Sequence, residues 1–292
     1  MGEGTESRAL LPELGRQPGH LFWRAAARVT AALDDVLPTG VDLHAYAALL
    51  ALAGGATRSQ QTIAEMVSVS RTTMTRVAGD LAEQGLVQRV RNPEDRRSYA
   101  LTRTAEGAAA ARRWRRHAED VEEAVTPGFD LAEREELRAG LLHLAEPDLP
   151  PTTPEPLRES IPFLIVRNHA SMHATFLELL RPVGIEPRHF GTLVGLRTSG
   201  PVSQSDLATI LGVSGPMIVQ IIDHLEDRGL VERRRSTTDR RAQMLHLTPA
   251  AGPTLDRARS LALHKSDELL ATMAPTERER LMTLLRRLVT AD

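Results

Sequence analysis

Apolar residues recur along this chain at helical spacing, interrupted by short stretches with turn residues between them. The apolar positions Ile63, Met74, Val77, Ala78 and Leu81 fall on the inner faces of two consecutive helices. The stretches 86–91 and 98–103 flank a turn and are typical of a two-stranded hairpin. In each half of the chain the pattern predicts a long first helix, three shorter helices, a hairpin and two closing helices. We therefore expect a mainly α fold with small β-wings.

The two halves repeat each other at an offset of 144 residues without a gap. Gly85-Leu86-Val87 aligns with Gly229-Leu230-Val231, and Asp95-Arg96-Arg97 aligns with Asp239-Arg240-Arg241. A repeat this long indicates a duplicated domain rather than a solenoid. We expect a disordered stretch over 1–17, a first unit over 18–145, a proline-rich linker over 146–156 and a second unit over 157–292. Five prolines in 147–156 predict an extended polyproline II spacer of roughly 30 Å.

The third and fourth expected helices of each half, followed by the hairpin, form a winged helix-turn-helix motif. In such a motif the second helix enters the DNA major groove and the hairpin arginines suit the narrow minor groove. The alternative is a solvated polar face without a ligand. The residues assigned to DNA contact are Ser70, Arg71, Thr72, Thr73, Thr75, Arg76, Arg91, Arg96 and Arg97 in the first half, and Ser214, Gly215, Met217, Gln220, Arg235, Arg240 and Arg241 in the second.

The two recognition helices differ where the rest of the repeat agrees. Arg76 aligns with Gln220, and the polar stretch 71–73 aligns with Gly215-Pro216-Met217. Arginine favours guanine and glutamine favours adenine in the major groove, so we expect unequal half-sites. The weak polarity of the second helix also leaves open a rival role, in which the second unit is a protein-interaction module that no longer reads DNA.

The stretches Ser70-Arg-Thr-Thr-Met, Gly85-Leu-Val-Gln-Arg and Asn92-Pro-Glu-Asp-Arg-Arg resemble the multiple-antibiotic-resistance regulator (MarR) family. That resemblance implies a transcriptional regulator whose first and last helices interleave in a dimer. Because this chain carries both copies, we expect two winged units that share a helical core as an internal pseudo-dimer on double-stranded DNA, with further oligomerisation left open. We expect a repressor, although activation is not distinguished from repression by the sequence.

The resemblance also implies a small aromatic or anionic effector, which binds between the core helices and the winged domain and releases DNA. The candidate ligand residues are His20, Trp23, Arg24, His44 and Tyr46 in the first unit, and Arg167, His169, His173, His189 and Phe190 in the second. Tyr46 and Phe190 align under the offset, and a core role for them is the alternative. No other cofactor is implied.

Other chemistries find less support. His169 and His173 are four residues apart and could share a metal ion on one helix face, but no third ligand follows from the sequence, so we expect no metal site. The chain has no recognisable phosphate loop, zinc-protease motif or nucleophile elbow, and we expect no enzyme. It has no cysteine, a net charge of -2 and no apolar stretch of the roughly 20 residues that a membrane span needs. A cytoplasmic protein without membrane contact is expected.

Overall fold

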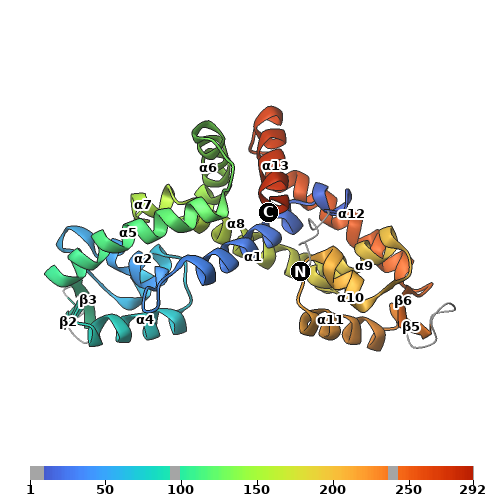
Figure 1. Cartoon of the computed structure of the whole chain (residues 1–292), viewed down its shortest axis with the longest axis horizontal. Helices are drawn as coiled ribbons and strands as arrows, with labels where there is room; N and C mark the ends of the chain where they lie inside the picture. Colours follow the sequence, from blue (N-terminus) through green and yellow to red (C-terminus); the bar gives the residue numbers. More distant parts are fainter. Residues whose placement is uncertain (1–9, 93–98, 236–242, 292) are drawn as a thin grey trace, which may run out of the picture. The chain divides into compact units, whose positions relative to one another are not determined.

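The computed structural model describes residues 10–92, 99–235 and 243–291 (Figure 1). The chain divides into two compact units. One unit is continuous, Ala26–Asn168, and the other combines the segment that ends at Ala25 with the segment that begins at His169. The predicted boundaries at 18–145 and 157–292 differ from these, because each unit includes a short segment of the other repeat.

The first repeat contains the expected helices and one extra strand. Its elements are α1 (Pro18–Val36), α2 (Leu43–Ala51), β1 (Thr57–Arg58), α3 (Gln60–Met66), α4 (Arg71–Glu83), β2 (Val87–Arg91), β3 (Tyr99–Arg103), α5 (Ala105–Val125) and α6 (Leu131–Ala145). The strands form an antiparallel sheet in the order β1-β3-β2, in which Thr57 pairs with Thr102 and Val87 pairs with Arg103. The predicted hairpin is therefore two strands of a three-stranded sheet.

The second repeat has the same order of elements. It comprises α8 (Ile161–Leu180), α9 (Pro187–Ser199), β4 (Val202–Ser203), α10 (Gln204–Leu211), α11 (Gly215–Asp227), β5 (Val231–Arg235), β6 (Gln243–Leu247), α12 (Ala251–Leu270) and α13 (Pro275–Thr290). Its sheet has the order β4-β6-β5. The predicted fold class, mainly helical with two small winged domains, is confirmed.

Local signals explain why the helix-turn-helix forms in both repeats. Ser70 and Ser214 cap α4 and α11, each accepting a hydrogen bond from the backbone N–H three residues later. Gly85 and Gly229 follow these helices with φ of 70° and 66°, a left-handed conformation that glycine adopts without steric cost. The chain therefore leaves each recognition helix at the same point and turns into the wing strand.

Each recognition helix is fixed by a buried apolar face. In α4 that face is Met74, Val77, Ala78 and Leu81, and in α11 it is the aligned set Ile218, Ile221, Ile222 and Leu225. Burial of one such large side chain contributes roughly 1.5–3 kcal/mol. The opposite face of each helix is consequently held toward solvent.

The N-terminal segment packs against the second repeat. Leu14 is only 1% exposed, and the Glu13 carboxylate lies 3.1 Å from the guanidinium groups of both Arg197 on α9 and Arg259 on α12. Arg286 on α13 donates a hydrogen bond to the Gly15 carbonyl. Residues 10–17, for which disorder was expected, are thus ordered, because Leu14 removes its apolar surface from water and Glu13 finds two cationic partners.

The proline-rich stretch packs against the first repeat in a corresponding way. It contains a 3-10 helix at Glu146–Asp148 and the short helix α7 (Glu155–Arg158), and Leu149, Thr153 and Leu157 are buried. The Thr153 hydroxyl donates a hydrogen bond to the Met66 carbonyl at the end of α3. The expected extended spacer is therefore wrong. Proline is compatible with the first turn of a helix, and the apolar residues between the prolines favour burial over extension.

Candidate nucleic-acid interface and ligand cavity

The exposed face of α4 carries cationic and hydroxyl side chains at its start. Arg71, Thr72 and Thr75 are exposed, and the side chains of Arg71 and Thr72 have no hydrogen-bond partner within the described part of the chain. The Thr75 hydroxyl donates to the Arg71 carbonyl at 2.9 Å. Thr73 is half-buried and its hydroxyl lies 2.8 Å from that of the cap residue Ser70. Arg71 and Thr72 are thus the side chains on this face that remain available to a ligand.

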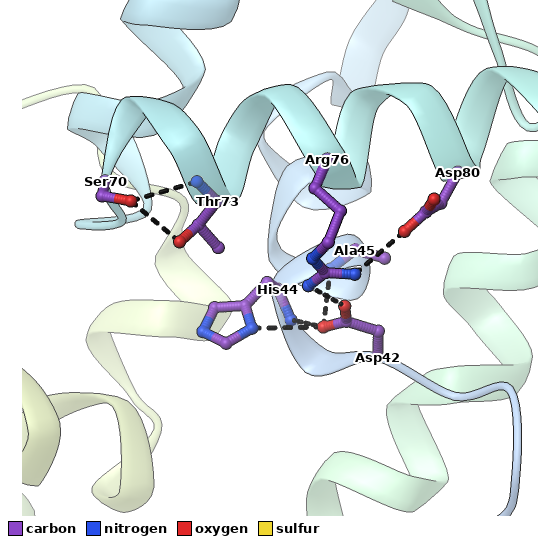
Figure 2. Close-up of polar contacts among 7 residues, drawn as sticks. All are labelled: Asp42, His44, Ala45, Ser70, Thr73, Arg76 and Asp80. Atoms are coloured by element: carbon purple, nitrogen blue, oxygen red, sulfur yellow. Dashed lines mark hydrogen bonds and ion pairs between the residues drawn. The ribbon is translucent and has the colours of Figure 1, made fainter.

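Arg76 is held by two carboxylates, as Figure 2 shows. One guanidinium nitrogen lies 2.9 Å from Asp42 at the start of α2 and another lies 2.9 Å from Asp80 on α4. Asp42 also caps α2, accepting from the backbone N–H groups of His44 and Ala45. The hydrogen bond from the His44 ring, followed by that from Arg76, holds the pKa of Asp42 far below its usual range.

These two ion pairs restrict Arg76, for which the sequence predicted a contact with a base. Its side chain is still 56% exposed, but its charge is compensated and its orientation is fixed by the two carboxylates. The Asp42 bond raises the pKa of the guanidinium further. Arg76 therefore ties the recognition helix to α2, and any contact with a base requires it to share or leave these partners.

In the second repeat, the corresponding contact between the second helix and the recognition helix is made by two histidine rings. His189, at the position of Ala45, is fully buried, and its ring stacks on that of His224, at the position of Asp80, with centroids 4.4 Å apart and an interplanar angle of 5°. The His189 Nδ1 accepts from the Glu186 backbone N–H at 3.0 Å. Burial, and then the neighbouring His224, lower the pKa of His189 to about 4. The ring is consequently neutral at physiological pH.

The exposed face of α11 is less polar than that of α4. Gly215, Pro216 and Gln220 are exposed, as are the apolar side chains of Met217 (41%) and Val219 (39%). The cap residue Ser214 is also exposed. In the second repeat, therefore, the structure presents the predicted recognition residues to solvent without a cation among them.

The wing residues are described in part. The Arg91 guanidinium lies 4.9 Å from the centre of the Tyr99 ring, and Arg235 is exposed at the end of β5. Arg233, in the same strand, forms ion pairs with Asp223 and Glu226, both on α11. The four arginines predicted at the hairpin tips, Arg96, Arg97, Arg240 and Arg241, lie outside the described residues.

A cavity of about 760 Å³ opens within the continuous unit 26–168. Its apolar wall includes Val29, Leu33 and Leu43 from the first two helices and Phe163 from α8, with Tyr46 among them. Arg134 and Arg138 of α6 line its polar side. Arg138 is bonded to Glu122 and to the Glu159 carbonyl. The buried Nε of Arg134 has no hydrogen-bond partner within the described residues. Apolar walls with a few polar groups are typical of small-molecule sites.

The structure does not gather the other predicted ligand residues at this cavity. His44 is bound to Asp42, and Arg167 lines a smaller cavity of about 310 Å³ together with Arg71 and Ser68. The rest belong to the other unit: His20 with Trp23, Arg24, the pair His169 and His173, and His189 with Phe190. Desolvation of the half-buried His20 ring, and then the charge of Arg24, lower the pKa of His20 to about 3. Arg24 donates to the Val289 carbonyl at 3.3 Å.

The sequence missed the residues that α5, α6 and α8 contribute to the larger cavity. In the sequence, Arg134 and Arg138 are simply polar positions of a closing helix. Phe163 was not expected at a cavity of the first repeat, because it belongs to the second repeat. A signal that could have found them is the position of two arginines four apart on one helix face. Which face points inward, however, is set by tertiary contacts, such as those of Arg138 with Glu122 on α5 and with the Glu159 carbonyl.

Two further observations concern metal and membrane. Within the described residues no group of three or more histidine, aspartate or glutamate side chains could hold a metal ion. Among the same residues no single helix is long and apolar enough to cross a bilayer, although α10 and α11, bent by 110° relative to each other, satisfy those criteria as a pair.

Comparison with known proteins adds independent evidence. The MarR family matches twice, at residues 39–98 and at residues 185–242, which places one match in each repeat. A protein of Thauera aromatica, provisionally assigned as the transcriptional regulatory protein for the hcr operon, is 32% identical over 123 residues, or 41% of this chain and 74% of that protein.

Among solved structures, the transcriptional repressor CouR bound to a 23-mer DNA duplex is 32% identical, covering 45% of this chain and 94% of its own, with a TM-score of 0.44. CouR from Rhodococcus jostii RHA1 bound to p-coumaroyl-CoA is 24% identical, covering 47% and 96%, with a TM-score of 0.42. The two family matches and the Thauera relative agree with the two winged helix-turn-helix motifs. The chain belongs to the MarR family of transcriptional regulators and carries two MarR units.

Proposed function

We propose that this protein is a ligand-responsive repressor that binds a two-half-site operator on double-stranded DNA as a single-chain pseudo-dimer. The observation that carries the proposal is the reciprocal exchange of segments between repeats. Residues 10–25 pack with the second winged domain, and residues 146–168 pack with the first. Interleaved terminal helices are what two MarR subunits would use to pair, so one chain supplies both halves of such a core.

Bonds across the exchanged segments support this proposal. In the unit 26–168, Asn168 on α8 donates to the Leu141 carbonyl of α6 at 2.8 Å, and the Ile161 backbone N–H donates to Glu122 of α5. In the other unit, Arg24 of α1 bonds to the Val289 carbonyl of α13. In the first repeat, α5 and α6 therefore contact the start of α8 from the second repeat. In the second repeat, α13 contacts α1 from the first repeat.

The DNA contacts are proposed at the exposed starts of α4 and α11 and at the wings. Arg71 and Thr72 suit phosphates and base edges, because guanidinium and hydroxyl groups are the usual donors to both. The family match covers α4 and α11 in full and reaches into both wings. Two such motifs in one chain would place recognition helices in neighbouring major grooves, about one helical turn apart.

The number of protein chains bound per DNA duplex tests whether one chain alone occupies the operator. The full-length protein would be used to select binding sites from random duplexes, and the complex with the selected site would be weighed by native mass spectrometry. We expect one chain per duplex and a footprint over two half-sites. A duplex with one half-site scrambled is the control and should bind much more weakly. Two chains on the intact duplex, with unchanged binding to the scrambled one, would contradict the proposal.

The ligand response is proposed to originate in the cavity of the unit 26–168. A small aromatic acid would place its ring against Tyr46 and Phe163 and its carboxylate near the buried Arg134 Nε, which otherwise has no hydrogen-bond partner in the described region. Such a ligand would contact α2, which Asp42 and Arg76 connect to α4. Titration with benzoate and cinnamate tests this: binding should quench tyrosine emission, weaken with Arg134→Leu, and lower operator affinity. Binding that Arg134→Leu leaves unchanged would place the ligand elsewhere.

A second candidate function concerns α11 alone. Met217 and Val219 are exposed on its outer face, where a protein partner could cover them. In that case the second unit would bind a protein and only the first would bind DNA. A footprint limited to one half-site, unaffected by substitutions on α11, would favour this candidate.

A further inference from the structure

The outer face of α11 differs from that of α4 in a consistent way. At the four aligned positions, Arg71, Thr73, Thr75 and Arg76 of the first repeat are replaced by glycine, methionine, valine and glutamine in the second. Both helices have a serine cap, a following glycine and four buried apolar positions, although the apolar residues at three of these four positions differ. The loss of cationic and hydroxyl side chains is therefore on the surface that the fold presents outward.

Packing does not require this change. A β-carbon added to Gly215 would meet no atom within 4 Å, so the fold has room for a side chain at the first residue of the helix. Met217 and Val219 lie outside the buried face of α11, and each residue is about two-fifths exposed to solvent. Exposed apolar side chains and an uncovered backbone at one helix start are features that a ligand, rather than folding, would explain.

The polar surroundings restrict the kind of ligand. Gln220 is exposed beside Val219 and offers an amide NH2 donor group and a carbonyl acceptor, while Asp223 is paired with Arg233. The apolar surface is two side chains wide, whereas a stable protein interface buries about 800 Å² on each partner. A narrow apolar strip next to an amide matches the major-groove edge of A·T pairs, where the thymine methyl group lies beside the adenine N6 and N7 atoms.

We propose that α11 reads thymine methyl groups through Met217 and Val219, with Gln220 bonding to a neighbouring adenine. This assignment rests on the proposed operator-binding function and specifies what its second half contacts. Gly215 allows the helix start to approach the DNA closely, since no side chain stands between its backbone and the groove. The operator is then asymmetric, with one half-site recognised by arginine and threonine groups and the other by apolar contact to methyl groups.

Deoxyuridine substitution tests the assignment, because uracil lacks the methyl group of thymine and keeps its hydrogen-bonding edge. The full chain is titrated with the selected operator, in which the thymines of one half-site at a time are replaced by deoxyuridine. We expect affinity to fall about fourfold for each contacted methyl group in one half-site, a factor typical of one buried carbon, and by less than twofold in the other. Operator with both half-sites unmodified is the reference.

Variants then assign the sensitive half-site to α11. Met217→Ser and Val219→Ser remove the apolar side chains without leaving a methyl group, and both sites are exposed, so folding should be retained. The double variant should bind the thymine and deoxyuridine operators equally. The aligned control, Thr73→Ser with Thr75→Ser on α4, should retain the difference between the two operators.

The outcomes separate this assignment from the proposed function. A two-half-site footprint with no effect of deoxyuridine in either half-site would overturn the methyl contacts and leave operator binding intact. A one-half-site footprint that the α11 variants do not alter would overturn the assignment in favour of a protein partner. Failure to select any DNA would overturn both the operator function and the contacts proposed within it.

Discussion

Lowering the pH should destabilise the unit that contains His189, because the unfolded chain binds a proton at this histidine more readily than the folded chain does. The buried ring accepts a hydrogen bond from the Glu186 N–H at Nδ1, so the proton of its neutral form is on Nε2. Protonating Nδ1 would oppose two N–H donors and place a charge against His224, with Arg188 and Arg228 also close and Glu186 only partly compensating. Burial and these neighbours lower the pKa of His189 from 6.5 to about 4.

The sign and size of the change in unfolding free energy follow from the difference between the pKa values of His189 in the folded and unfolded states. Above about pH 6.5 the ring is neutral in both states and has no effect. Between about pH 6.5 and 4 the unfolded chain binds the proton and the folded chain does not, so stability is lost as the pH falls. The loss is about 2 kcal/mol at pH 5 and approaches about 3 kcal/mol below pH 4. His20 in the same unit, with a pKa lowered to about 3, acts in the same direction.

Urea unfolding can isolate this effect, because the two tryptophans belong to different units. Trp23 lies in the unit with His189 and Trp114 lies in the other. A Trp114→Phe background would let Trp23 fluorescence report on one unit at pH 7.5 and pH 5. His189→Gln retains an acceptor at the third helical position and cannot be protonated. The decrease in unfolding free energy between the two pH values should be about 2 kcal/mol smaller in this variant. An equal decrease in both proteins would refute the reasoning.

Three further outcomes are expected. Leu14→Ala should lower the unfolding free energy of the same unit by ~2–5 kcal/mol in urea titrations, whereas Leu263→Ala, at an exposed position, should have a much smaller effect. Asp42→Asn should retain the α2 cap but release its arginine partner on α4, so operator affinity should rise at low salt and fall more steeply as salt increases. Arg97→Ala and Arg241→Ala should each weaken operator binding by ~1–3 kcal/mol in gel-shift titrations.

The recognition helices illustrate what a sequence pattern can predict. Their caps at Ser70 and Ser214, their buried faces and the glycines that end them are set by residues within a few positions of one another. Caps, apolar spacing and a terminal glycine can all be recognised within a short stretch of sequence, so helix bounds and outward residues followed from spacing. The partners of Arg76 did not follow, because Asp42 lies 34 residues away and its side chain also caps another helix.

The ligand residues show the opposite case. Tyr46 was expected at a cavity and lines one, but its neighbours Arg134 and Phe163 come from the last helix of the first repeat and the first helix of the second. His20, Trp23 and Arg24 were expected beside Tyr46 and instead belong to the other compact unit. The offset relates each residue to its copy, and it carries no information about which copy of a helix packs with which winged domain.

The sequence by itself determined the duplication, the order of elements in each repeat, the two recognition helices and their divergence, because these depend on periodicity and on caps between near neighbours. Only the tertiary structure decided that residues 10–25 pack with the second repeat and 146–168 with the first, that Arg76 is paired, and that His189 is buried beneath His224. These features arise from burial, hydrogen bonds and charge pairing between segments up to 271 residues apart, for which local sequence carries no signal.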